Sequence, residues 1–140
     1  MWRAPVRAIA IEQTRPLRGT VLRPHETAAE LAAHEPEGAF AAGAFDGEAL
    51  VAVGFIAPDG TPGGWRVQGM ATAPAARGGG AGTAILQTLM DHASERGARR
   101  IWCNARTPAR TLYERAGMRV CSEEFELPHI GPHVVMETLR

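Results

Sequence analysis

The segment Arg77-Gly78-Gly79-Gly80-Ala81-Gly82 constrains this chain most, because it lies between a predicted strand and the strongest predicted helix. The first turn of a helix leaves four backbone N–H groups unpaired and carries about half a positive charge. Glycines at such a place let an anion approach the backbone without meeting a Cβ atom, and Arg77 adds a fork-shaped cation. The segment therefore predicts a phosphate-binding loop that suits a pyrophosphate.

Two common phosphate-binding loops do not fit this segment. A Walker A loop ends in a lysine, and all fifteen basic residues of the chain are arginines. A Rossmann loop of the form G-x-G-x-x-G would use Gly80 and Gly82 but meets Ile85 at its third position. The next predicted strand, Ile101–Asn104, also offers no acid for a ribose. What remains is Arg77-x-x-Gly80-x-Gly82, the R-x-x-G-x-G/A form of acyl-CoA-binding loops.

Composition limits the remaining possibilities. A chain of 140 residues with 45% hydrophobic and 21% charged residues predicts one globular domain, residues 1–140. Its zero net charge gives no global field for nucleic acid or an anionic membrane. The longest uncharged apolar run, Ala49–Ala57, is too short to span a bilayer. Cys103 and Cys121 lack C-x-x-C spacing and the N-terminus lacks a signal-peptide core, so we expect a reduced, cytoplasmic protein.

Three segments have the apolar spacing and end signals of helices. They are Thr14–Arg23, the run from Gly82 to Arg96, and Thr107–Ala116. Thr14 and Thr107 are the expected N-caps, and Gly97 and Gly117 are the expected left-handed ends. The stretch Pro24–Gly38 stays open between helix and loop, because Thr27, Glu30 and Leu31 favour a helical turn and Pro36 breaks it.

Alternating or continuous apolar runs between the helices predict strands. These runs are Val6–Ile11, Ala39–Phe45, Glu48–Ile56, Trp65–Thr72, Ile101–Asn104, Met118–Phe125 and His133–Thr138. The dipeptide Asp46-Gly47 predicts a two-residue hairpin turn. The order of elements mixes early antiparallel pairing with one later strand-helix-strand crossover, so the predicted fold class is α+β with a mixed sheet.

A second motif lies downstream of the glycine loop. Ala109-Arg110-Thr111-Leu112-Tyr113-Glu114-Arg115-Ala116-Gly117-Met118 is similar to the A-x-x-L-Y-E-x-x-G-F block of the GNAT-superfamily N-acetyltransferases, and the loop is similar to their coenzyme A loop. With both motifs in order, the chain resembles a short, single-domain bacterial member over Val6–Thr138. The resemblance implies a mostly antiparallel mixed sheet flanked by helices, acetyl-CoA as co-substrate, and direct acetyl transfer to a primary amine without a metal.

The resemblance also implies roles for individual residues. The loop, from Arg77 through Gly78, Gly79, Gly80 and Ala81 to Gly82, would bind the coenzyme pyrophosphate, and the backbone of Met70, Ala71 and Thr72 would bind the pantetheine arm. Tyr113, the one tyrosine of the chain, would protonate the leaving thiolate. Ala109, Asn104 and Arg106 would lie beside the cofactor, with Arg106 where the family commonly has an asparagine and Met118 where it has a phenylalanine.

The general base is the open assignment. Many relatives place a carboxylate on the fourth strand, where this chain has Gln68, nine residues before Arg77. The remaining candidates are Glu12, His25, Glu26, Glu126 and His133. His133 is the favoured candidate, for base or substrate contact, because histidine titrates near neutrality, although a structural histidine fits the same pattern. Cys121, His129 and His133 match no zinc-ligand spacing, so no metal is expected.

The charge of the chain indicates only the general class of the acceptor and of the binding partners. Neutral charge without a basic or acidic stripe favours a small-molecule or peptide amine, with no nucleic acid or membrane partner. Because Gln68 cannot take up a proton, a non-catalytic acyl-CoA-binding or regulatory protein of the same fold is the alternative. A third interpretation is an interaction module in which the glycine loop binds nothing. An exposed final strand would allow a homodimer.

Overall fold

Two neighbouring strands of the sheet form a β-hairpin. In the computed structural model, which describes residues 2–140, β2 (Phe40–Asp46) and β3 (Ala49–Pro58) pair as an antiparallel hairpin. The hairpin is confirmed, but its loop lies one residue later than predicted, because Asp46 pairs with Ala49 and leaves Gly47 and Glu48 as the loop. Gly47 has a φ of 61°, as a hairpin turn with glycine first requires.

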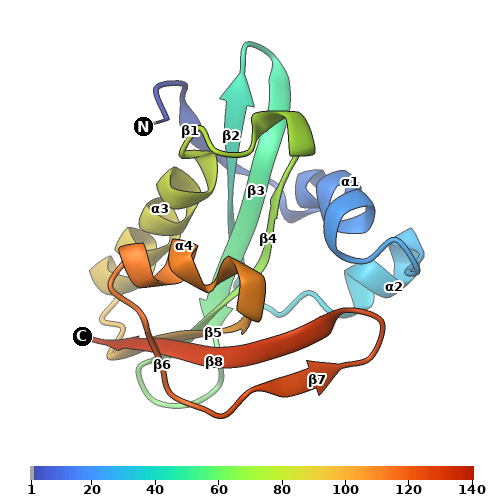
Figure 1. Cartoon of the computed structure of the whole chain (residues 1–140). Coiled ribbons are helices and arrows are strands. Elements are labelled where there is room, and N and C mark those ends of the chain that lie inside the picture. Colours follow the sequence, from blue (N-terminus) through green and yellow to red (C-terminus); the bar gives the residue numbers. More distant parts are fainter. Residues whose placement is uncertain (1) are drawn as a thin grey trace.

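Eight strands form one mixed sheet (Figure 1). Its order is β1-β2-β3-β4-β5-β8-β6, with β7 paired to β8, and all pairs are antiparallel except β4 with β5. The other strands are β1 (Val6–Ile9), β4 (Gly64–Thr72), β5 (Arg100–Arg106), β6 (Arg119–Val120), β7 (Phe125–Leu127) and β8 (Gly131–Leu139). The prediction of an exposed final strand is therefore wrong. The strand β8 lies inside the sheet, with partner strands on both sides.

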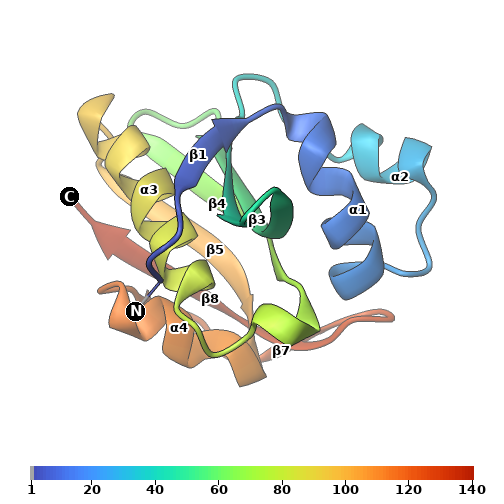
Figure 2. The ribbon, with the colours of Figure 1, turned by 90° about the horizontal axis from the view of Figure 1, so that it is seen from above.

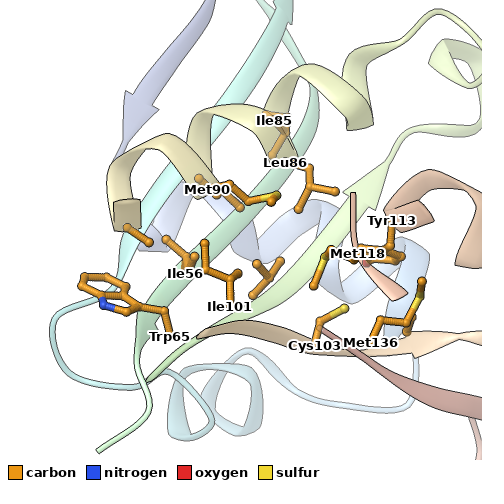
Figure 3. Close-up of a cluster of buried hydrophobic side chains, with 14 of the residues drawn as sticks. Ile56, Trp65, Ile85, Leu86, Met90, Ile101, Cys103, Tyr113, Met118 and Met136 are labelled. Atoms are coloured by element: carbon orange, nitrogen blue, oxygen red, sulfur yellow. The ribbon is translucent and has the colours of Figure 1, made fainter. Parts of the chain in front are cut away.

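Helices cover both faces of this sheet, as Figure 2 shows. The helix α3 (Ala81–Glu95) packs on one face with the short α4 (Arg110–Arg115), while α1 (Arg15–Leu17) and α2 (Ala28–Ala33) lie on the other. One side of α3 is buried at helical spacing against the strands (Figure 3), through Ile85, Leu86, Leu89, Met90 and Ala93. Gly97, with a φ of 82°, follows α3 as predicted. The predicted α+β class with a mostly antiparallel sheet flanked by helices is confirmed.

The first helical segment differs from its prediction. It starts earlier, with a 3₁₀ turn at Ile11–Thr14, continues through α1 and ends in a π-helical turn at Arg18–Leu22. Thr14 is fully buried and does not cap, because its hydroxyl donates to the Ile11 carbonyl at 2.6 Å and accepts from Arg18. The turn at Ile11–Thr14 already begins the helix, so the cap position falls on Ala10.

The stretch left open after Pro24 contains α2. Thr27 and Glu30 form a capping box, in which the Thr27 hydroxyl accepts from the Glu30 N–H at 3.1 Å and the Glu30 carboxylate accepts from the Thr27 N–H at 3.0 Å. Leu31 is the buried residue of this helix. The reciprocal cap therefore decides between helix and loop for residues 28–33.

The C-terminal third also departs from the prediction. A 3₁₀ turn, Thr107–Ala109, precedes α4, and Thr107 donates its hydroxyl to Glu124 at 3.0 Å instead of capping. The predicted strand Met118–Phe125 is two short strands, β6 and β7, both paired to β8. They separate because the Ser122 hydroxyl, and no backbone carbonyl, accepts from the Val135 N–H at 2.8 Å.

Candidate functional site

The two parallel strands of the sheet separate and open the site between them. β4 and β5 pair only where Gly64–Arg66 faces Arg100–Trp102, although β4 continues to Thr72 and β5 to Arg106. Beyond Arg66 the two strands have no paired residues, and a cavity of about 460 Å³ is lined by both of them. The sheet therefore provides a cleft whose walls are unpaired strand backbone.

A bulge in β4 changes which side chains face this cleft. Gly69 and Met70 lie opposite the single residue Gly54, because Gln68 pairs with Phe55 and Ala71 with Val53. Gly69 has a φ of 67°, and a Cβ atom there would lie 2.5 Å from the Phe55 ring, so only glycine fits. The extra residue of a bulge is left out of the ladder, and its backbone N–H group is free for another acceptor.

The bulge also inverts the alternation of side chains along β4. Before it, Trp65 and Val67 pack into the core on the α3 side; after it, Met70 does. Gln68 and Ala71 line the cavity on either side of this change. Of the predicted pantetheine contacts, Met70, Ala71 and Thr72 all border the cavity.

The glycine loop leads from β4 into α3. Gly80, with a φ of 90°, is the N-cap of α3, and no side chain caps the first turn. A second hollow of about 640 Å³ is lined by the loop together with Thr72 and Leu112. Arg77 borders both hollows, and its Nε donates to the Thr72 carbonyl at 3.4 Å. The start of α3 thus faces a hollow and has no side-chain cap.

The members of the predicted loop differ in their positions. Gly78, Gly80, Ala81 and Gly82 line the second hollow. Gly79 borders neither hollow, and a Cβ atom there would lie 3.6 Å from the Trp2 ring. Ala81 is 1% exposed and its side chain belongs to the core, so only its backbone can contact a ligand.

Tyr113 on α4 borders the main cavity and is 7% exposed. Burial raises the pKa of its phenol well above the usual value of 10.0. A phenol with a raised pKa is protonated at neutral pH and gives up its proton only to a strong base. Met118, the predicted core substitute for phenylalanine, is buried with Tyr113 in the same cluster (Figure 3).

Asn104 and Arg106 of β5, and Ala109 after it, also border the cavity. Arg106 donates from Nη2 to the Leu22 carbonyl at 2.8 Å, so its side chain ties β5 to the end of the first helical segment. Burial lowers the pKa of Arg106. Its position is therefore near the expected cofactor, but one of its donors is committed to the protein.

His133 lies in β8 and reaches the cavity from the side opposite β4. It is 4% exposed, stacks on Phe125 with ring centroids 6.0 Å apart, and has its Nδ1 2.8 Å from the Gly131 carbonyl. A carbonyl only accepts, so Nδ1 carries the proton and neutral His133 has its lone pair on Nε2. The arrangement gives this histidine a defined proton acceptor.

The other candidate bases do not line the cavity. Glu12, His25 and Glu126 lie elsewhere, while Glu26 contacts two lining residues, Arg23 at 3.1 Å and His34 at 3.4 Å. Within residues 2–140 no group of three potential ligands could hold a metal ion, so Cys121, His129 and His133 do not form a site.

Sequence reasoning missed the far half of the cavity. Its lining there comes from the first helical segment, from His34 and from the β7–β8 turn, with Arg18 and Arg66 as the main charged residues. Arg18 is 5% exposed, donates to Glu35 at 2.6 Å and to the Leu31 carbonyl at 3.0 Å, and lies over the Phe55 ring. The two-residue period of β4 could have found Arg66, since it lies two positions before Gln68 on the same face.

Comparison with known proteins decides the family. The sequence model of the Acetyltransferase (GNAT) family matches residues 6–118. The chain belongs to this family. A curated relative from Bacillus subtilis (strain 168), the uncharacterized N-acetyltransferase YitI, is 32% identical over 143 residues and is covered, like this chain, to 96%.

Solved GNAT structures share the fold. A Bacillus subtilis acetyltransferase in complex with CoA superposes with a TM-score of 0.76 at 14% identity, over 99% of both chains. The ribosomal-protein-S18-alanine N-acetyltransferase from Escherichia coli gives 0.78 at 16% identity, over 98% of this chain and 94% of that one. In the described residues, no helix is long and apolar enough to cross a membrane.

Proposed function

We propose that this GNAT protein is an acetyl-CoA-dependent N-acetyltransferase that acts on the primary amine of a small molecule or peptide in the cytoplasm. The observation that carries the proposal is the continuity of the main cavity. It extends from Arg77 and Thr72, beside the glycine loop, past Tyr113 to His133. One ligand can therefore have its phosphates at the loop and its reactive end at the bulge of β4.

The residues present fit coenzyme A. The first turn of α3 has no side-chain cap, and the hollow in front of it is lined by glycines, where Cβ atoms would fill the space. Arg77 supplies a cation at the same place. Bound acetyl-CoA supplies an acetyl thioester. The separated strands β4 and β5 leave backbone groups that can hydrogen-bond its pantetheine arm.

We assign each proton transfer to a side chain that borders the main cavity. His133 Nε2 takes a proton from the ammonium of the acceptor, so that the free amine can attack the acetyl carbon. The backbone N–H groups at the bulge, near Met70, stabilise the negative charge on the acetyl oxygen. Tyr113 gives its phenol proton to the departing thiolate, and the phenolate then takes up the proton that the attacking nitrogen loses. The transfer is direct, with no covalent intermediate on the protein.

The alternative of a non-catalytic coenzyme-binding protein, raised by Gln68, is not favoured, because His133 offers a proton acceptor on the opposite wall of the same cavity. The variant Tyr113→Phe separates the two functions. We expect the rate of acetyl transfer to fall on the order of 100-fold or more. Binding of acetyl-CoA, followed by the shift in melting temperature, should change little, because the ring and its packing remain.

The assay is release of free thiol from acetyl-CoA in a screen of amines. Equal rates of wild type and Tyr113→Phe with every accepted amine would show that Tyr113 is not the acid. Binding of acetyl-CoA without turnover of any amine would favour the non-catalytic alternative. Absence of any melting shift at millimolar acetyl-CoA would remove both functions.

A further inference from the structure

Arginines line the main cavity, and the carboxylates that pair with some of them lie outside its lining. The cations of its lining are Arg18, Arg23, Arg66, Arg77 and Arg106, and the two histidines His34 and His133 also line it. Among the residues that the structure describes, no aspartate or glutamate lines it. A cavity of this kind attracts anions and repels polycationic amines.

Four of the five arginines are bound to the protein itself. Arg18 and Arg23 have carboxylate partners in Glu35 and Glu26, at 2.6 and 3.1 Å. Arg77 and Arg106 donate to backbone carbonyls, and Arg77 lies beside the glycine loop. These four therefore do not define the charge of the acceptor.

Arg66 is different. Within residues 2–140 no carboxylate lies within ion-pair distance of it, and its Nε is buried with no hydrogen-bond partner. Its guanidinium lies over the Trp102 ring, 4.9 Å from the centroid, in a cation–π contact. A buried donor without an acceptor costs free energy that a bound ligand would recover.

The position of Arg66 assigns it to the acceptor and not to the coenzyme phosphates. It precedes Thr72 by six residues along β4, which is about 20 Å of strand, and the glycine loop follows Thr72. It precedes the bulge at Gly69 by three residues, about 10 Å. Its long side chain can therefore hold one end of a small molecule whose other end reaches the bulge.

We propose that the acceptor is a small amine that carries a carboxylate, and that Arg66 binds this carboxylate. A guanidinium donates two parallel hydrogen bonds to a carboxylate, which gives orientation as well as charge complementarity. Such a contact at Arg66 directs the amine of the same molecule toward the bulge and His133. The inference rests on the proposed acetyltransferase function and names its substrate class.

Binding of product-like probes tests this inference without turnover. The protein saturated with coenzyme A is titrated with the common N-acetyl-L-amino acids and with their amides, in which the carboxylate is replaced by a neutral group. We expect at least one N-acetyl amino acid to raise the melting temperature and to bind about tenfold to a hundredfold more tightly than its amide. In parallel, the free amino acid should be acetylated faster than its amide.

Three variants locate the contact. Arg66→Gln should weaken binding of the N-acetyl amino acid to the level of its amide. It should leave unchanged the rise in melting temperature that acetyl-CoA causes. Arg66→Lys should retain part of the preference for the acid over the amide. Arg100→Gln is the matched control, because Arg100 also lies over Trp102, at 5.3 Å, but pairs with Glu137 and does not line the cavity. It should keep the full preference.

The inference is overturned if acids and amides bind alike, or bind not at all, in wild type, or if Arg66→Gln keeps the preference. Acetylation of neutral or cationic amines together with that result would leave the proposed function standing and remove only the substrate class. If acetyl-CoA did not raise the melting temperature of the wild-type protein, the proposed function itself would be wrong.

Discussion

Substitutions at Gly82 can separate effects on protein stability from effects on coenzyme binding. It has an ordinary helical conformation, and a Cβ atom there would meet Leu112 at 3.6 Å and Thr72 at 3.7 Å, both normal contacts. Gly82→Ala should therefore stabilise α3 by about 0.5–1 kcal/mol. With an unfolding entropy of about 0.3 kcal/mol/K for a chain of this length, the melting temperature rises by roughly 2–3 °C.

The same position controls access to the start of α3. Alanine is an accepted residue at the last position of the R-x-x-G-x-G/A loop, so Gly82→Ala should keep coenzyme binding. Gly82→Leu extends the side chain into the hollow lined by Arg77 and Gly80. We expect it to fold, since leucine is a good helix former, and to lose the site for the pyrophosphate.

Gly80 provides the contrasting variant. Its φ of 90° is left-handed, so Gly80→Ala should cost about 1–2 kcal/mol and lower the melting temperature of the free protein by roughly 3–7 °C. The two glycines lie two residues apart, yet alanine should raise the melting temperature at one and lower it at the other. Local backbone conformation explains the difference.

The assay is thermal unfolding with and without acetyl-CoA. At about 100 times its dissociation constant the ligand adds roughly 2.7 kcal/mol, or about 9 °C, to wild type and to Gly82→Ala. Gly82→Leu should show no such shift. A folded Gly82→Leu protein that keeps the full shift would refute the placement of the coenzyme at the helix start.

Three further predictions concern stability, acid sensitivity and thiol reactivity. Glu35→Gln should cost about 3 kcal/mol, or roughly 10 °C in melting temperature, because it leaves buried Arg18 without its carboxylate; a change below about 1 kcal/mol would show that the ion pair contributes little. The hydrogen bonds from Arg15, and then those from Arg18, hold the pKa of Glu35 below its usual 4.5, so the stability it contributes is present at neutral pH and is lost as the pH falls below that value. Acid unfolding should therefore be less steep in Glu35→Gln, and an unchanged pH profile would contradict this cause. Burial raises the pKa of the Cys103 thiol to about 12, so iodoacetamide at neutral pH should modify exposed Cys121 and leave Cys103 intact, as mass spectrometry of tryptic peptides will show.

Local signals predicted the elements whose ends are fixed by glycine and by hydrophobic spacing. The α3 helix, its end at Gly97 and the hairpin at Gly47 all depend on conformations that neighbouring residues impose. Predictions of side-chain caps were wrong at Thr14 and Thr107. The Thr14 hydroxyl bonds with Ile11 and Arg18 inside a helical segment that starts earlier than predicted. The Thr107 hydroxyl bonds with Glu124, a distant residue that only the packed chain brings near.

The candidate site also has one part that sequence motifs predict and one part that they do not. The glycine loop and Tyr113 have motifs with fixed spacing, so the coenzyme half could be predicted from the sequence. The far half of the cavity could not, because Arg18, His34 and Arg66 come from three separate segments that meet only in the folded chain. The base stays a prediction: the sequence favoured His133 because histidine titrates near neutrality, and it left Glu26 as an alternative.

The sequence by itself determined that this chain has a glycine-lined helix start, a mixed sheet and the chemistry of the GNAT family, because these depend on residues near one another along the chain. Only the tertiary structure decided where β4 separates from β5 and which charges meet in the cleft. A bulge at Gly69 inverts the side chains of a strand, and its effect is set by Gly54 and Phe55 on the neighbouring strand. Contacts between distant segments form the lining of the cleft, and no local pattern encodes them.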